Sequence, residues 1–177
     1  MTFSERTFRD ALGLFPTGVA VVTTVAADGT RLGATVSSFN SVSLDPPLVL
    51  FSVARNAKAF PVWAEADRYA VNLLREEQSA LSTRFARPMS DKWDNLEPVE
   101  QDGLILLPNT LAWFGCEAHA RFDGGDHLIL VGRVSAFAVA SGAQARPLVF
   151  FKGRYRQLDP DQDIETPQGL DHLLHGW

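Results

Sequence analysis

Residues 15–51 read FPTGVAVVTTVAADGTRLGATVSSFNSVSLDPPLVLF, and this stretch decides the fold. Residues 19–25 are rich in β-branched side chains, and Asp28-Gly29 is a hairpin turn signal. Residues 31–43 are therefore expected to form the return strand. The apolar run at residues 48–53 predicts a further, buried strand.

The middle of this stretch, GATVSSF at residues 33–39, has few bulky side chains and three hydroxyls in four positions. A strand that only filled a core would favour Val, Ile and aromatic residues. Small and hydroxylated residues instead let a planar polar ligand lie against the backbone and collect hydrogen bonds. The alternative is an edge strand whose hydroxyls are simply solvated.

The remaining pattern predicts a mainly β protein with short helices. Helices are expected at residues 2–14, 56–66 and 76–86, with Ser4 or Thr2 capping the first and Asn56 capping the second. Strands are expected at residues 69–74, 111–122, 127–139, 148–151 and 154–158, with a polar loop at 87–101 and a short apolar segment at 104–107. Many strands joined by hairpin turns indicate a closed antiparallel β-barrel with helical decorations.

Composition excludes several function classes. The net charge is −5 and the 16 basic residues are scattered, so nothing favours binding to nucleic acid or to an anionic membrane. No apolar run approaches the roughly 20 residues that span a bilayer, and the polar N-terminus is no signal peptide. We therefore expect a cytoplasmic protein. Cys116, the one cysteine, is read as a small buried hydrophobe, and neither cysteine count nor histidine spacing predicts a metal site.

Three segments together resemble the short-chain NAD(P)H:flavin reductases, which supply reduced flavin to partner monooxygenases. They are the run at 15–51, GDHLILVGRV at 125–134 and PLVFFKGRY at 147–155. The resemblance covers roughly residues 8–158. It implies a Greek-key-like FMN-binding split barrel over residues 1–158 and a homodimer with the flavin near the subunit interface. Residues 159–177 are expected to be an irregular tail or to pack on the dimer partner.

The resemblance also implies a flavin site. The segment from Thr35 to Phe39 would run along the flavin, and the residues after the strand at 48–53 would hold its phosphate. The end of a strand, the start of a helix and the cations Arg55 and Lys58 could also form a phosphate site on physical grounds. The alternative is that both charges are solvated at the surface. The cofactor-binding residues implied are Pro16, Thr17, Thr35, Val36, Ser37, Ser38, Phe39, Ser52, Arg55, Asn56, Lys58, Ser82, Arg84 and Phe85.

Two further side chains are implied to work beside the flavin. His127 follows Gly124-Gly125-Asp126 and begins a strand, so it is expected at a barrel rim, facing the nicotinamide and the flavin ring. Tyr155 is expected close to the flavin or the nicotinamide. Taken alone, His127 reads as a surface residue, Tyr155 as a barrel-closing aromatic and Phe85 as helix core.

The predicted function is an NAD(P)H-dependent flavin reductase that transfers hydride from nicotinamide to FMN or FAD. The choices between FMN and FAD, and between NADH and NADPH, stay open. One alternative is a flavoprotein that retains FMN and reduces a corrinoid, a quinone or a small aldehyde. Another is a flavin-binding module without enzymatic activity.

Overall fold

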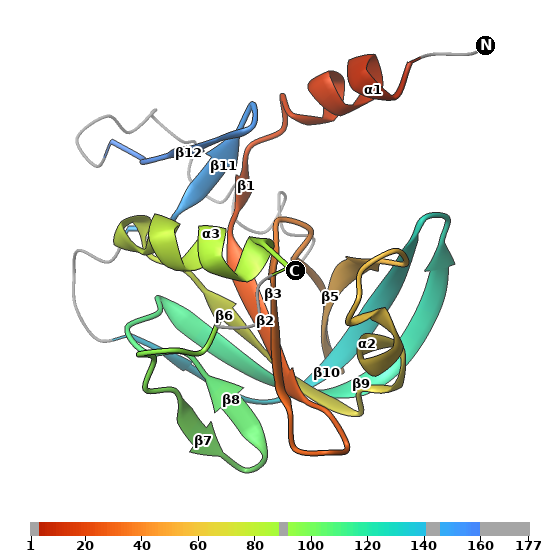
Figure 1. Cartoon of the computed structure of the whole chain (residues 1–177), viewed down its shortest axis with the longest axis vertical. Helices are drawn as coiled ribbons and strands as arrows, with labels where there is room; N and C mark the ends of the chain where they lie inside the picture. The colour runs from red at the N-terminus through yellow and green to blue at the C-terminus, as the bar shows by residue number, and fades with distance from the viewer. Residues whose placement is uncertain (1–3, 89–91, 141–145, 160–177) are drawn as a thin grey trace.

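A computed structural model describes residues 4–88, 92–140 and 146–159, and its main feature is a strongly bent seven-stranded sheet (Figure 1). All neighbouring strands are antiparallel, in the order β3-β2-β6-β9-β10-β5-β4. The strands are β2 (Ala20–Val25), β3 (Arg31–Val36), β4 (Asn40–Leu44), β5 (Pro47–Ala54), β6 (Arg68–Leu73), β9 (Ala112–Gly124) and β10 (His127–Val139). The mainly β prediction is therefore confirmed.

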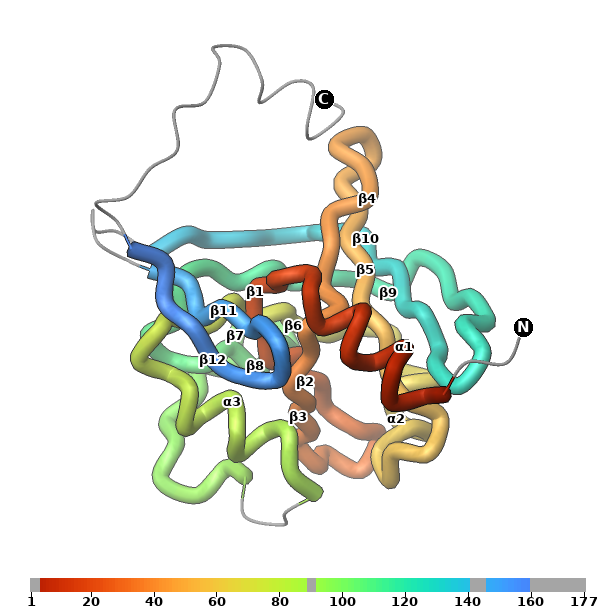
Figure 2. Tube along the Cα trace, turned by 90° about the horizontal axis from the view of Figure 1, so that it is seen from above, coloured from red at the N-terminus to blue at the C-terminus, as the bar shows by residue number. Residues whose placement is uncertain are grey.

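The other elements are short. Strands β1 (Thr17–Gly18), β11 (Val149–Phe151) and β12 (Arg154–Arg156) form a three-stranded sheet, and β7 (Val99–Gln101) pairs with β8 (Leu104–Leu106). The helices are α1 (Glu5–Leu12), α2 (Phe60–Glu65), α3 (Ser79–Ala86) and the 3-10 helix η1 (Glu76–Gln78). Figure 2 shows the β4–β5 hairpin extending beyond the rest of the described chain.

The two edges of the large sheet are β3 and β4, and no backbone ladder joins them within the described residues. The strand pairing therefore does not close the sheet into the predicted barrel. Near this opening, however, β3 and β5 are in contact. The Ser52 backbone N–H donates to Ser38 Oγ at 2.9 Å, so a side chain bridges the gap between the two ends of the sheet.

Strand β2 contributes side chains to two core clusters, one on each of its faces. Val22 packs with Phe51 and Trp63 on one face, whereas Val21 packs with Phe85 on the other. Phe51 stands edge-on to Trp63 at 5.9 Å between ring centroids. Because both faces of β2 are covered, its side chains are buried without alternation from Ala20 to Thr24.

Several predicted boundaries are wrong for local reasons. Residues 31–43 do not form one strand, because β3 ends at Val36 and β4 begins at Asn40. The predicted buried strand is β5, which buries only alternate residues. Part of the predicted loop at 87–101 is strand β7.

The helix expected at 56–66 begins only at Phe60, and Asn56 does not cap it. Two turns precede the helix, with Ala57 N–H donating to the carbonyl of Ala54 and Phe60 N–H to that of Ala57. Pro61 is then in the first helical turn, where its missing N–H costs nothing. The cap of α1 is confirmed, since the Thr7 N–H donates to Ser4 Oγ at 3.1 Å.

No helix among the described residues is both long enough and apolar enough to cross a membrane. The predicted tail at 159–177 lies outside the described residues after Asp159.

Cys116 should be inert in the native protein. Its side chain is fully buried in β9, and burial raises the pKa of the thiol from 9.0 to about 12. At pH 8 the reactive thiolate is therefore about a thousandfold scarcer than in a free cysteine. We expect no labelling by Ellman's reagent in native protein and one thiol per chain after denaturation. Rapid native labelling would contradict this packing.

Candidate functional site

A cleft of about 1390 Å³ lies between β3, the chain that follows β5, the end of α3 and the β9–β10 turn. Nine of the residues implied by the resemblance line it. They are Thr35, Val36, Ser37, Ser38, Ser52, Asn56, Lys58, Phe85 and His127.

One wall of the cleft is β3, the edge strand of the large sheet. Since β3 pairs only with β2, half of its backbone N–H and C=O groups point away from a partner strand. The wall needs a glycine, because a Cβ on Gly33 would lie 2.4 Å from the Phe85 ring. Phe85 is buried there and meets Trp93 edge-on at 5.0 Å, so it is part of the core and also lines the cleft. Its contact with a flavin stays a prediction.

Two of the three hydroxyls of this wall already hold the cleft together. Thr35 Oγ1 donates to the carbonyl of Ser82 at 2.6 Å, which ties β3 to α3. Ser38 Oγ accepts from Ser52 N–H and ties the end of β3 to β5. Ser37 is exposed in the cleft. Trp93 and Lys92 donate to the β3 carbonyls of Arg31 and Gly33, so the wall offers a ligand the remaining edge groups of β3 and the Ser37 hydroxyl.

A polar and cationic end of the cleft is formed by Ser52, Asn56 and Lys58. Ser52 is half-buried near the end of β5, and Asn56 and Lys58 are exposed in the turns before α2. Arg55 is not part of the lining. Its guanidinium instead donates to the Asp123 carboxylate and to the carbonyl of Gly125.

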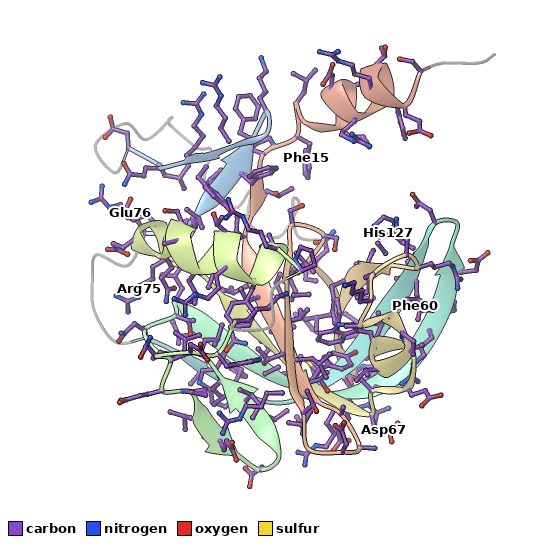
Figure 3. All side chains as sticks on the ribbon, viewed as in Figure 1. Phe15, Phe60, Asp67, Arg75, Glu76 and His127 are labelled. Carbon is purple, nitrogen blue, oxygen red and sulfur yellow. The ribbon has the colours of Figure 1, made fainter. Side chains whose placement is uncertain are left out.

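His127 lies at the rim of the cleft, where β10 begins (Figure 3). Its Nδ1 is 2.7 Å from Oδ1 of Asp126. This hydrogen bond holds the pKa of the Asp126 carboxyl below its ordinary value, so the carboxylate is ionised at neutral pH and can only accept. Nδ1 therefore carries the hydrogen, and Nε2 of the ring is left for another partner.

The other implied residues do not line the cleft. They are Pro16, Thr17, Phe39, Arg55, Ser82, Arg84 and Tyr155. Tyr155 meets Ser82 through their hydroxyls at 2.8 Å, and Arg84 donates to the carbonyl of Asp94. These contacts fasten α3 to the β11–β12 hairpin and to the following segment. Direct roles of these residues toward a flavin stay predictions.

Sequence reasoning missed Lys92 and Trp93, which lie in the predicted polar loop. Lys92 Nζ donates to the carbonyls of Gly33 and Phe85, and burial lowers the pKa of this ammonium. Trp93 Nε1 donates to the carbonyl of Arg31. A tryptophan within an otherwise polar segment was the available signal, because such a side chain seldom stays in water.

The cleft has the donor set that a flavin requires. The open edge of β3 suits the carbonyl and amide groups of a flat ring, and the small side chains leave room beside it. The ammonium of Lys58 and the hydroxyl of Ser52 suit a phosphate. Within the described ranges, no three His, Cys, Asp or Glu side chains are grouped to hold a metal ion.

Comparison with known proteins gives a consistent result. Residues 12–159 match the family described as flavin reductase like domain. The chain is 43% identical over 153 residues to the FMN reductase (NADH) SmoA of Agrobacterium fabrum, covering 86% of this chain and 85% of SmoA. It is also similar to the NADH:FAD oxidoreductase SgcE6 of Streptomyces globisporus, solved with NAD and FAD fragments. That structure has a TM-score of 0.83 and 33% identity, covering 90% of this chain and 96% of SgcE6.

A further relative is the reductase component of the flavin-dependent trigonelline monooxygenase of Acinetobacter baylyi. It is 43% identical over 151 residues, which are 85% of this chain and 48% of that protein. The chain thus spans about half the length of the first curated relatives it matches. The family resemblance seen in the sequence is confirmed.

Proposed function

The chain belongs to the flavin reductase like domain family, and on this premise we propose that it is an NAD(P)H-dependent flavin reductase. FMN is the flavin we favour, with FAD also admitted, and NADH or NADPH is the reductant. The reduced flavin then serves a partner flavin-dependent monooxygenase. The observation that carries the proposal is the cleft itself, which joins a strand edge, a polar and cationic end and a rim histidine.

Each part of the cleft has a distinct task in this proposal. The edge backbone of β3 orients the ring, and Ser52, Asn56 and Lys58 bind the phosphate. Nε2 of His127 contacts the nicotinamide and holds it against the ring. When bound, the flavin supplies the hydride acceptor, so the protein contributes position and electrostatics and needs no acid in the transfer itself.

The test is NADH oxidation at 340 nm by purified protein, with and without added FMN, FAD or riboflavin. Oxidation that rises and saturates with added flavin supports the proposal and ranks the flavins. A yellow protein whose rate ignores added flavin retains its cofactor and reduces a different acceptor. Absence of NADH oxidation by flavin-loaded protein would leave only a binding module.

We further propose that residues 1–158 form one domain with the FMN-binding split-barrel fold. The Ser38–Ser52 hydrogen bond supports this, since it bridges the sheet where no ladder runs. The cytoplasm, where reduced nicotinamide is at hand, is the location we propose.

The active unit in this proposal is a homodimer. An aromatic row supports it: Phe114 stacks on Phe39 at 5.8 Å and on Phe137 at 6.0 Å. Phe137 is nevertheless 65% exposed and Val139, farther along β10, is 69% exposed. Exposed apolar surface of this kind favours burial against another chain.

Phe137→Asp should therefore convert the dimer to a monomer, because a charge in a buried apolar contact loses its hydration. Light scattering after gel filtration measures this as a fall toward the 19.4 kDa mass of one chain. Phe122→Asp is the matched control, since Phe122 is similarly exposed near the opposite end of the β9–β10 hairpin. A monomeric wild type would overturn the homodimer, and a dimeric Phe137→Asp would move the interface elsewhere.

A further inference from the structure

The turn that carries His127 is held from outside by one arginine. Arg55 follows β5, and its backbone N–H donates to the carbonyl of Asp126 at 2.9 Å. Its Nε donates to the carbonyl of Gly125 at 3.0 Å, and its Nη2 contacts the Asp123 carboxylate at 2.6 Å. Three hydrogen bonds from a single residue thus hold the end of β9 and the turn Gly125-Asp126 immediately before His127.

The two side-chain contacts need the shape of arginine more than its charge. A guanidinium presents several N–H groups in a rigid plane, so it can reach a carbonyl and a carboxylate at once, whereas an ammonium acts as a point charge. The guanidinium also lies 5.6 Å from the ring centroid of Phe60, which limits its freedom to turn. Arg55 is therefore held in the orientation that the turn requires.

The ion pair contributes little to stability. The Arg55 and Asp123 side chains are 41% and 80% exposed, and exposed pairs of this kind are weak because water screens them. What the contacts do supply is a defined position for the turn. Loss of Arg55 should accordingly leave the fold intact and loosen the residues next to the cleft.

Those residues are Asp126 and His127. The Asp126 carboxylate accepts from Nδ1 of His127, which fixes the tautomer and the plane of the ring. A shift of the turn would move the carboxylate, and the ring with it. Arg55 therefore affects the cleft through Asp126 and His127, although Arg55 itself does not line the cleft.

We propose that Arg55 is a positioning residue for nicotinamide, acting through the β9–β10 turn and the Asp126–His127 pair, and that it does not bind the flavin phosphate. The proposal rests on the proposed function and names how its nicotinamide side is built. The phosphate role suggested by the sequence makes the opposite kinetic prediction, so the two are separable.

In steady-state kinetics with NADH and FMN, Arg55→Met should lower kcat/KM for NADH about three- to tenfold. The dissociation constant for FMN should stay within about twofold. Asp123→Asn should repeat this effect in weaker form. Arg55→Lys should not restore the rate, because a point charge cannot make both contacts, whereas a phosphate role would be largely restored by lysine.

Coupling to His127 is the decisive readout. In a His127→Ala background, Arg55→Met should have no further effect on kcat/KM for NADH, because both changes remove the same interaction. Additive losses would overturn the proposal. So would a tenfold weaker FMN affinity with unchanged use of NADH, since that result restores the phosphate role.

A measurement without flavin or NADH separates this proposal from the proposed function. The ring ¹⁵N resonances of His127, assigned by their loss in His127→Ala, should show hydrogen on Nδ1 in wild type. They should show mixed tautomers in Arg55→Met and Asp126→Ala. If no flavin supports NADH oxidation, the proposed function fails. These spectra would still show whether Arg55 positions the turn and the His127 ring. Unchanged spectra in Arg55→Met would overturn the positioning role.

Discussion

His127→Ala is expected to lower kcat/KM for NADH by about 10- to 100-fold, which corresponds to about 1.4–2.7 kcal/mol of transition-state stabilisation. The reason is geometric. His127 is at the cleft rim with Nδ1 hydrogen-bonded to Asp126, so its loss removes the side chain that we propose holds nicotinamide through Nε2. The dissociation constant for FMN should change less than about twofold, because we propose that the ring and the phosphate are bound by other residues of the cleft.

Two further variants sharpen this test. His119→Ala is the matched control, since His119 is an exposed histidine of β9 outside the cleft lining. His127→Gln keeps a polar group near the position of Nε2 and should retain more activity than His127→Ala. Stopped-flow reduction of bound FMN by NADH measures the relevant step directly. An unchanged rate in His127→Ala would remove His127 from the mechanism.

The fold could be predicted because its signals are local. The apolar run of β5, the Asp28-Gly29 turn and the long paired runs of β9 and β10 each depend on neighbouring residues. The start of α2 could not be predicted in the same way. Asn56 is a good capping residue by type, but residues 55–59 form turns between β5 and α2. The cap position of α2 is therefore occupied by Ala59.

The residues of the site also differ in how well the sequence could place them. The family resemblance implied that Lys58 and His127 belong to the site, and both line the cleft, although His127 taken alone reads as a surface residue. Lys92 could not be predicted, because its contacts with the carbonyls of Gly33 and Phe85 join segments distant in sequence. For Arg55 the local signal was misleading. Its cation beside a strand end suggested phosphate binding, but the guanidinium donates to the carboxylate of Asp123, which is 68 residues away in the chain.

Lys58→Ala is expected to raise the dissociation constant for FMN by about 10- to 150-fold, or about 1.5–3 kcal/mol, through loss of one charge-assisted hydrogen bond. Lys58 is exposed in the cleft beside Ser52 and Asn56, so the ammonium can meet a phosphate without first losing a structural contact. Fluorescence quenching of the flavin on titration with protein measures the affinity. Lys152→Ala, which removes an equal charge from the exposed β11–β12 hairpin, is the control.

Riboflavin, which has the same ring without the phosphate, isolates the cause. Lys58→Ala should change riboflavin affinity less than about twofold, and an equal loss for both ligands would mean that Lys58 supports the ring or the local fold. If neither affinity changes, the phosphate lies at another cation of the described lining, which also contains Arg31, Arg87 and Lys92. We favour Lys58 because the ammonium of Lys92 already donates to two backbone carbonyls and burial lowers its pKa. A phosphate at Lys92 would have to displace contacts that fasten α3 to β3, whereas the Lys58 side chain is exposed and is expected to exchange only hydration water for the phosphate.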